Sequence, residues 1–239
     1  MNILAVDTST PLASVAITTD DTIIAESVFL ADRSLSARLV PEIERLLAIA
    51  ALSAADVHIF AGSVGPGSFT GVRAGIATIQ GLALATGRPC AGFSSLTLLA
   101  MNFPLAAFPV CALLDARKGE VYAGLFDCST PIPTSLISDG VMPPESLLDL
   151  ISTTTDRPVI FAGEGALRYR DLIISTLGEQ AILAPYPHHA PHAAHGALLA
   201  REAELRGELI EPAGLLPRYI RASEAEYAKL DQQKSLRAK

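Results

Sequence analysis

Residues 65–73 read G-P-G-S-F-T-G-V-R, the densest cluster of residues with special backbone conformations in this chain. Three glycines and a proline within nine residues predict a shaped loop rather than a regular element. The apolar run at 57–61 before the loop predicts a buried strand, and apolar residues then recur at helical spacing over 72–84. The stretch therefore predicts a strand, a tight loop and a helix, a unit typical of α/β folds.

The loop resembles a phosphate site only in part. A helix that starts after a glycine-rich loop directs backbone N–H groups and its positive end toward whatever lies above it. No Lys-Ser or Lys-Thr pair follows the loop, so the pattern of nucleoside triphosphatases is not met.

The helix after the loop carries Gly71 and Gly75 on one face, with Ala74 and Ala77 nearby. A glycine inside a helix costs about 1 kcal/mol relative to alanine, which indicates that something packs closely there. Two interpretations remain open at this point: the helix lies tightly on its own sheet, or it packs against a partner protein.

Composition limits the class of protein. The chain has 239 residues, of which 50% are hydrophobic and 18% charged, enough to bury the core of one large domain or two lobes. A net charge of −7 argues against a chain that holds nucleic acid by itself. The three cysteines lack metal-ligand spacing, which favours buried, reduced thiols. With no signal peptide or membrane-spanning run, a cytoplasmic protein without membrane contact is expected.

The first half of the chain predicts a mixed sheet covered by helices. Strands are expected at 3–6, 13–18 and 22–28, consecutive and antiparallel. An amphipathic helix over 36–50 follows, and then the unit around 65–73. A further strand at 89–93 and a short helix over 94–101 complete the series.

The turn after the first strand reads Asp7-Thr8-Ser9-Thr10. Carboxylate and hydroxyl oxygens suit a magnesium-bound phosphate. An ordinary turn stabilised by Asp and Ser/Thr side chains has the same composition.

The second half repeats this opening. A strand at 110–114 leads into the charged turn 115–119 and a returning strand at 121–126, which indicates two related lobes around a cleft. A short helix at 146–152 and a strand at 158–162 lead into Gly163-Glu164-Gly165, where a ligand or another backbone could approach closely. We therefore consider a vestigial nucleotide cleft, with weak nucleotide or magnesium binding, made by Asp7, Thr8, Ser9, Asp115, Arg117, Gly163 and Gly165.

The expected organisation is an N-terminal lobe at 1–108 and a C-terminal lobe at 109–190. A helix within 191–211 is expected to pack back on the first lobe, before an extended segment and mobile tail at 212–239. The motif P-R-Y-I-R at 217–221 fits an exposed strand or a contact with RNA by stacking and charge. Four histidines cluster before and within that helix, at His188, His189, His192 and His195, but neighbouring prolines break the helical spacing that a metal site would need.

Together these motifs resemble the TsaB (YeaZ) family, the bacterial partner of the TsaD enzyme that makes threonylcarbamoyladenosine on tRNA. The resemblance runs over nearly the whole chain. It rests on the opening at 3–10, the loop and helix at 65–83, the turn D-A-R-K-G-E-V-Y at 115–122 and P-R-Y-I-R at 217–221. It implies the two-lobed fold with mixed sheets flanked by helices that actin, sugar kinases and chaperone ATPases share (the ASKHA fold).

The resemblance also implies a role without catalysis. The related catalytic subunit holds its metal with a His-x3-His pair on an early helix, where this chain has Leu35 and Leu39. Leucine cannot coordinate a metal. A scaffold subunit is therefore expected, with no cofactor and no metal of its own.

The hypothesis is that the first lobe binds and activates TsaD for N6-threonylcarbamoylation of adenosine 37 in tRNAs that read ANN codons, with the ATPase TsaE as third component. A homodimer is expected when the chain is alone, and tRNA contact only through the complex. The alternatives are an ATPase or phosphotransferase of the same fold and a metal-dependent acyltransferase that uses the histidines. The expected partner interface comprises Leu39, Ile43, Gly65, Pro66, Gly67, Ser68, Phe69, Thr70, Gly71, Arg73, Ala74 and Gly75.

Overall fold

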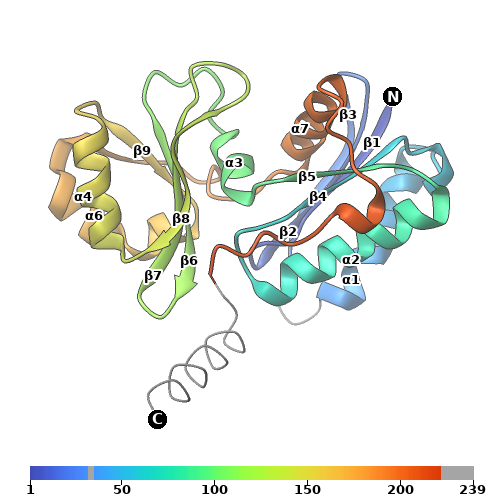
Figure 1. Cartoon of the computed structure of the whole chain (residues 1–239), viewed down its shortest axis with the longest axis horizontal. Helices are drawn as coiled ribbons and strands as arrows, with labels where there is room; N and C mark the ends of the chain where they lie inside the picture. Colours follow the sequence, from blue (N-terminus) through green and yellow to red (C-terminus); the bar gives the residue numbers. More distant parts are fainter. Residues whose placement is uncertain (32–34, 222–239) are drawn as a thin grey trace, which may run out of the picture.

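The computed structural model describes residues 1–31 and 35–221, so the expected tail at 222–239 lies outside the described residues. The chain forms two lobes, each built on a five-stranded mixed sheet with helices on its faces (Figure 1). Within the described ranges, no helix combines the length and the apolar character needed to cross a membrane.

The first sheet has the strand order β3-β2-β1-β4-β5. The first three strands are antiparallel neighbours, as the sequence predicts, whereas β4 and β5 run parallel to β1. The bounds are β1 Asn2–Asp7, β2 Leu12–Thr19, β3 Thr22–Leu30, β4 Ile59–Ser63 and β5 Cys90–Phe93.

The second sheet repeats this arrangement with the order β10-β9-β6-β7-β8. Its central strand pairs antiparallel with β7 and parallel with β9, as β1 pairs with β2 and β4. The duplication and the two-lobed fold are therefore confirmed. The bounds are β6 Val110–Arg117, β7 Glu120–Asp127, β8 Thr134–Met142, β9 Val159–Ala162 and β10 Ala181–Leu183.

Helices cover both faces of the first sheet (Figure 1). The helices α1 (Leu35–Ile49) and α2 (Phe69–Thr86) bury their apolar stripes in the core on one face. On the other face lies α7 (Ala193–Leu205), whose alanines allow it to lie close to β1 and β2. α2 begins three residues earlier than its apolar spacing predicts, because Ser68 Oγ accepts a hydrogen bond from the Gly71 N–H and caps the helix.

The second sheet is covered by α4 (Pro144–Thr154) and α6 (Arg170–Leu177) on one face. The short helix α3 (Ser95–Ala100) packs on the other face and is capped by Ser94. The sequence patterns did not predict β8, β10, α6 and α5 (Glu164–Arg168), nor the single 3-10 turns at Ala54–Asp56, Gly178–Gln180 and Pro212–Gly214.

Candidate functional site

The glycines of the loop seat α2 on the turn that follows β1. A Cβ atom added to Gly67 would lie 2.3 Å from the Ser9 carbonyl oxygen, and one at Gly71 would lie 2.1 Å from that of Thr8. The Ser68 N–H donates to the Ser9 carbonyl at 2.7 Å, and Thr8 Oγ1 donates to the Gly71 carbonyl at 2.8 Å. Of the two interpretations of the glycine face, the structure shows packing within the chain, because Gly71 and Gly75 lie against the turn after β1 and not against a partner protein.

This packing buries Asp7 completely. One oxygen of its carboxylate accepts a hydrogen bond from Ser9 Oγ at 3.1 Å, whereas Oδ1 is buried without a partner. Burial raises the pKa of Asp7 to about 6. The opening turn is thus part of the core of the first lobe and not an open phosphate site.

The second acidic turn is occupied by its own arginines. The Asp115 carboxylate lies 3.4 Å from Arg117 Nη1 and 3.2 Å from Arg168 Nη1. Two guanidinium groups at one carboxylate disfavour a bound cation there. Asp115 and Arg117, which the sequence suggested for a vestigial nucleotide cleft, instead pair with each other, and this pairing argues against magnesium at Asp115.

Close packing also explains Gly163 and Gly165. A Cβ atom at Gly163 would lie 2.1 Å from the Leu113 carbonyl oxygen, and one at Gly165 would lie 3.0 Å from Leu113 Cβ. The approaching group is therefore β6 and not a nucleotide. None of the seven residues of the expected cleft lines the cavity described below.

The histidines make structural contacts. His189 Nδ1 accepts a hydrogen bond from the Gly163 N–H at 3.0 Å, and His189 Nε2 lies 2.8 Å from the Ala184 carbonyl. His192 pairs with Glu26 on β3 at 3.2 Å, and the ring of His195 lies beside that of His192. Across residues 1–31 and 35–221, no group of three His, Cys, Asp or Glu side chains is arranged to hold a metal ion.

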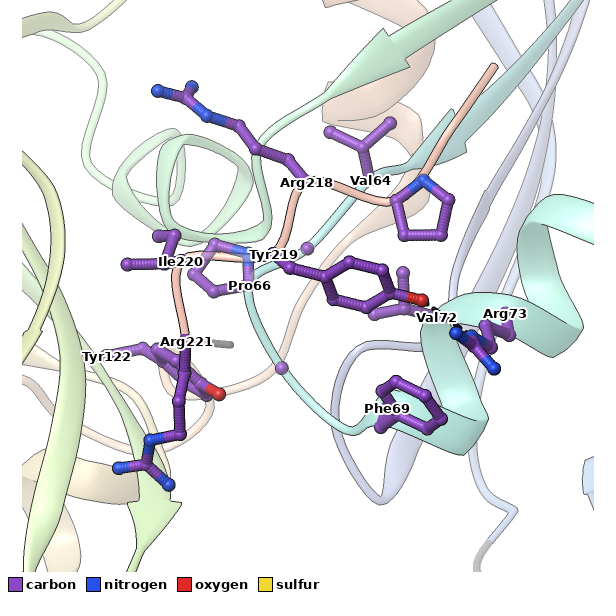
Figure 2. Close-up of a pocket in the computed structure, with 13 residues that line it drawn as sticks. Val64, Pro66, Phe69, Val72, Arg73, Tyr122, Arg218, Tyr219, Ile220 and Arg221 are labelled. Carbon is purple, nitrogen blue, oxygen red and sulfur yellow. Dashed lines mark hydrogen bonds between the residues drawn. The ribbon is translucent and has the colours of Figure 1, made fainter. Parts of the chain in front are cut away.

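A cavity of about 590 Å³ lies between the lobes, where three of the sequence motifs meet (Figure 2). One side is formed by the loop and the start of α2, and the other by Tyr122 of β7. The segment 217–221 closes it. The lining residues are Val64, Gly65, Pro66, Gly67, Phe69, Val72, Arg73, Tyr122, Pro217, Arg218, Tyr219, Ile220 and Arg221.

Aromatic rings and arginines alternate around this cavity. The rings of Phe69 and Tyr219 are stacked, with centroids 5.5 Å apart. The Arg73 guanidinium lies 3.7 Å from the Phe69 centroid, and its Nε donates to the Tyr219 hydroxyl. Across the cavity, the Arg221 guanidinium lies 5.9 Å from the centroid of the Tyr122 ring.

The segment 217–221 bridges the two lobes and is not the free exposed strand that its composition suggests. The Arg218 N–H donates to the Val64 carbonyl of the first lobe at 2.8 Å. Arg221 Nη1 donates to the Ala116 carbonyl of the second lobe at 2.7 Å, and the same side chain forms an ion pair with Glu120. This bridge passes between the lobes in Figure 1.

The outer face of α1 and α2 differs from the expected partner interface. Leu39 and Ile43 are only 1% and 2% exposed, because they lie on the inner face of α1 within the core. The structure therefore corrects the expectation for these two residues, as it does for Gly71 and Gly75, which are buried. The exposed side of α2 instead carries apolar or small residues, which are Phe69, Ala77, Gly81 and Leu84, and Val40 and Ile49 are exposed on opposite sides of α1.

Comparison with known proteins places the chain in a family. Residues 29–229 match the family described as "TsaD: tRNA N6-adenosine threonylcarbamoyltransferase". The Bacillus subtilis protein named "tRNA threonylcarbamoyladenosine biosynthesis protein TsaB" is 31% identical over 234 residues, which is 98% of this chain and 100% of that protein.

Solved structures agree with this placement. The structure of YeaZ from Pseudomonas aeruginosa is similar with a TM-score of 0.76 and 32% identity, covering 91% of this chain and 99% of that one. The ROK hexokinase of Thermus thermophilus, at 12% identity and a TM-score of 0.52, shares the fold alone and covers 85% of this chain and 100% of that one. The matches over nearly the full length, together with the duplicated sheets, show that the chain belongs to the TsaB (YeaZ) family.

Proposed function

We propose that this chain is a non-catalytic scaffold that binds TsaD and activates it for N6-threonylcarbamoylation of adenosine 37 in tRNAs that read ANN codons. The ATPase TsaE is the third component, and tRNA is bound through the complex. The names of the relatives support the pathway. The enclosed Asp7 and the ion-paired Asp115 support a role without catalysis, because both acidic turns are used within the fold.

The observation that supports a partner surface is the exposed outer face of α2, where Leu84 is 66% exposed. The neighbouring helix α1 also exposes apolar side chains, with Val40 at 43% and Ile49 at 56% on its two sides. A Cβ atom at Gly81 would meet nothing within 4 Å, so the backbone of α2 is open to another helix there. Of the residues expected from the sequence, Ser68, Phe69, Thr70, Arg73 and Ala74 lie at or beside this face and remain in the proposed interface.

The same face serves a second copy of the chain when TsaD is absent, in a homodimer. Burial of this exposed apolar surface is favourable whether the partner is TsaD or a second copy of the chain. Light scattering of the purified chain, with and without TsaD, distinguishes the homodimer from the heterodimer.

The decisive test is reconstitution of threonylcarbamoyl transfer to tRNA with TsaD and TsaE from the same organism, with and without this chain. The chain alone with ATP is measured in parallel. We expect product only when this chain and TsaD are both present. ATP turnover or transfer by this chain alone would contradict the proposal and favour an ATPase or phosphotransferase.

A substitution locates the surface. Gly81→Leu places a large side chain on the outer face of α2 without contact to the lobe's own core, so it should weaken TsaD binding at least tenfold while the chain stays folded. Ser146→Leu makes a comparable change on the exposed side of α4 in the other lobe and should leave binding unchanged. Equal affinity of both variants for TsaD would place the interface elsewhere.

A further inference from the structure

The cavity between the lobes has the chemistry of a ligand site. Its volume of about 590 Å³ lies within the range of small-molecule sites. Among the described residues that line it there are three aromatic rings, three arginines and no aspartate or glutamate. On a chain of net charge −7, this is a local concentration of positive charge.

The aromatic rings stand on opposite sides of the cavity. Phe69 and Tyr219 belong to the first-lobe side, and Tyr122 belongs to β7 of the second lobe (Figure 2). Phe69 and Tyr219 are each 45% exposed, although both are large apolar rings. Partly exposed aromatic rings on two sides of the cavity suit a flat ring between them.

The arginines are placed beside these rings. Arg73 lies against Phe69, Arg221 lies near Tyr122, and Arg218 lines the cavity between them. Glu120 forms an ion pair with Arg221, and the negative charge of Asp139 interacts with the positive charge of Arg218. Arg73 is therefore the guanidinium best placed to bind an anion. An arginine next to a stacking ring recognises a flat base that carries a phosphate.

We propose that this cavity binds a nucleotide unit, with its base between the aromatic rings and its phosphate at the arginines. The site differs from the cleft expected at Asp7 and Asp115, which is filled by protein side chains. The proposal goes beyond the scaffold function and does not depend on TsaD. The nucleotide unit comes from one of two sources, a free nucleotide or a residue of single-stranded RNA.

The test is equilibrium binding to the isolated full-length chain at low salt, with AMP and a single-stranded adenosine hexanucleotide as separate probes. Tyr122→Leu removes the ring on one side, and Arg73→Gln removes the charge on the other. Each change should weaken binding about tenfold. Tyr186→Leu, at a tyrosine that is 92% exposed, and Arg206→Gln, at a surface arginine, are the matched controls and should bind as the unmodified chain does.

The outcomes separate the two sources and can overturn the site. Binding of AMP assigns a free nucleotide, whereas binding of the RNA alone assigns a residue within a strand. Binding of neither probe, or equal binding by all four variants, overturns the proposal. Circular dichroism checks folding, and Phe69→Leu replaces Tyr122→Leu if that variant does not fold. Because TsaD is absent from these measurements, their failure would leave the scaffold function intact.

Discussion

Gly75 of α2 lies so close to Thr8 that a Cβ atom at position 75 would be 2.3 Å from Thr8 Oγ1. Thr8 Oγ1 already donates a hydrogen bond to the Gly71 carbonyl, which fixes it against the helix. We therefore expect Gly75→Ala to lower the free energy of unfolding by about 1–3 kcal/mol, because the helix has to move away from the turn. Urea denaturation at neutral pH measures this change.

Gly81 provides the matched control on the same helix. Its Cβ position is open, so Gly81→Ala removes only the conformational entropy of glycine and should stabilise the chain by about 0.5–1 kcal/mol. Opposite signs at positions 75 and 81 would show which face of α2 packs on the sheet. Destabilisation by both changes would contradict the packing described for Gly75.

Asp7 makes stability depend on pH. Burial raises its pKa from 3.8 to about 6, so the ionised form is less stable in the folded chain than in the unfolded chain. Above pH 6 this lowers the free energy of unfolding by up to about 3 kcal/mol, and the penalty disappears as pH falls below 4.

The neutral variant Asp7→Asn tests this effect, since it retains an oxygen that accepts from Ser9. We expect it to be more stable than the unmodified chain at pH 7.5 and about equal to it at pH 4. Urea midpoints at the two pH values provide the comparison. A difference that does not change with pH would show that Asp7 does not ionise in this range.

Local patterns in the sequence predict much of the fold. Apolar runs predict the strands around β1, β2 and β6, and the short helix expected over 94–101 contains α3. β8 was not predicted, because all of its residues are exposed or half-buried and its sequence includes Asp139 and Gly140, residue types that are uncommon in strands. β10 has only three residues, too few for a periodic signal.

The site was predicted less well, for a physical reason. A glycine pattern shows that something approaches the backbone but not what approaches, so Gly71, Gly75 and Gly163 fitted a partner or a ligand as well as their own chain. Likewise, P-R-Y-I-R at 217–221 does not reveal that Tyr219 stacks on Phe69, which is 150 positions earlier. One signal in the sequence could have linked the two segments, because 65–73 and 217–221 each combine arginine with an aromatic residue.

Glu26 and His192 form a second pH-dependent contact. Glu26 accepts hydrogen bonds from His192 and from the Ala194 N–H, which joins β3 to the start of α7. The hydrogen bond to Glu26 raises the pKa of His192 above 6.5. Burial raises the pKa of Glu26, but its hydrogen bonds outweigh burial and lower the pKa below 4.5.

The signs define a pH window for Glu26→Gln. The raised pKa of His192 stabilises the fold below 6.5 and ceases to do so as pH rises through the folded value, while Glu26 stays ionised down to below 4.5. We expect the variant to lose stability on the order of 1 kcal/mol near pH 5.5 and less at pH 8. Thermal melting at both pH values measures it.

Glu42→Gln is the control for this comparison. Glu42 pairs with Arg45 on α1, and arginine does not titrate between pH 5.5 and 8. Its effect on stability should therefore be the same at both pH values. If Glu26→Gln behaves in the same way, protonated His192 does not contribute to the contact.

The bridge at 217–221 leads to a prediction about the mobility of the lobes. Arg221 is tied to the second lobe through Ala116 and Glu120, and the Arg218 N–H is tied to Val64 of the first. Arg221→Gln should destabilise the bridge by about 1 kcal/mol, which corresponds to roughly fivefold faster hydrogen exchange at the Arg218 amide.

Arg157→Gln is the control, because Arg157 also donates to a backbone carbonyl, that of Ala107, but does not contact the bridge. Mass spectrometry of peptides that cover 217–221 should show faster exchange only in the first variant. Unchanged exchange in both would mean that the Val64 contact and the Tyr219 stack hold the segment without Arg221.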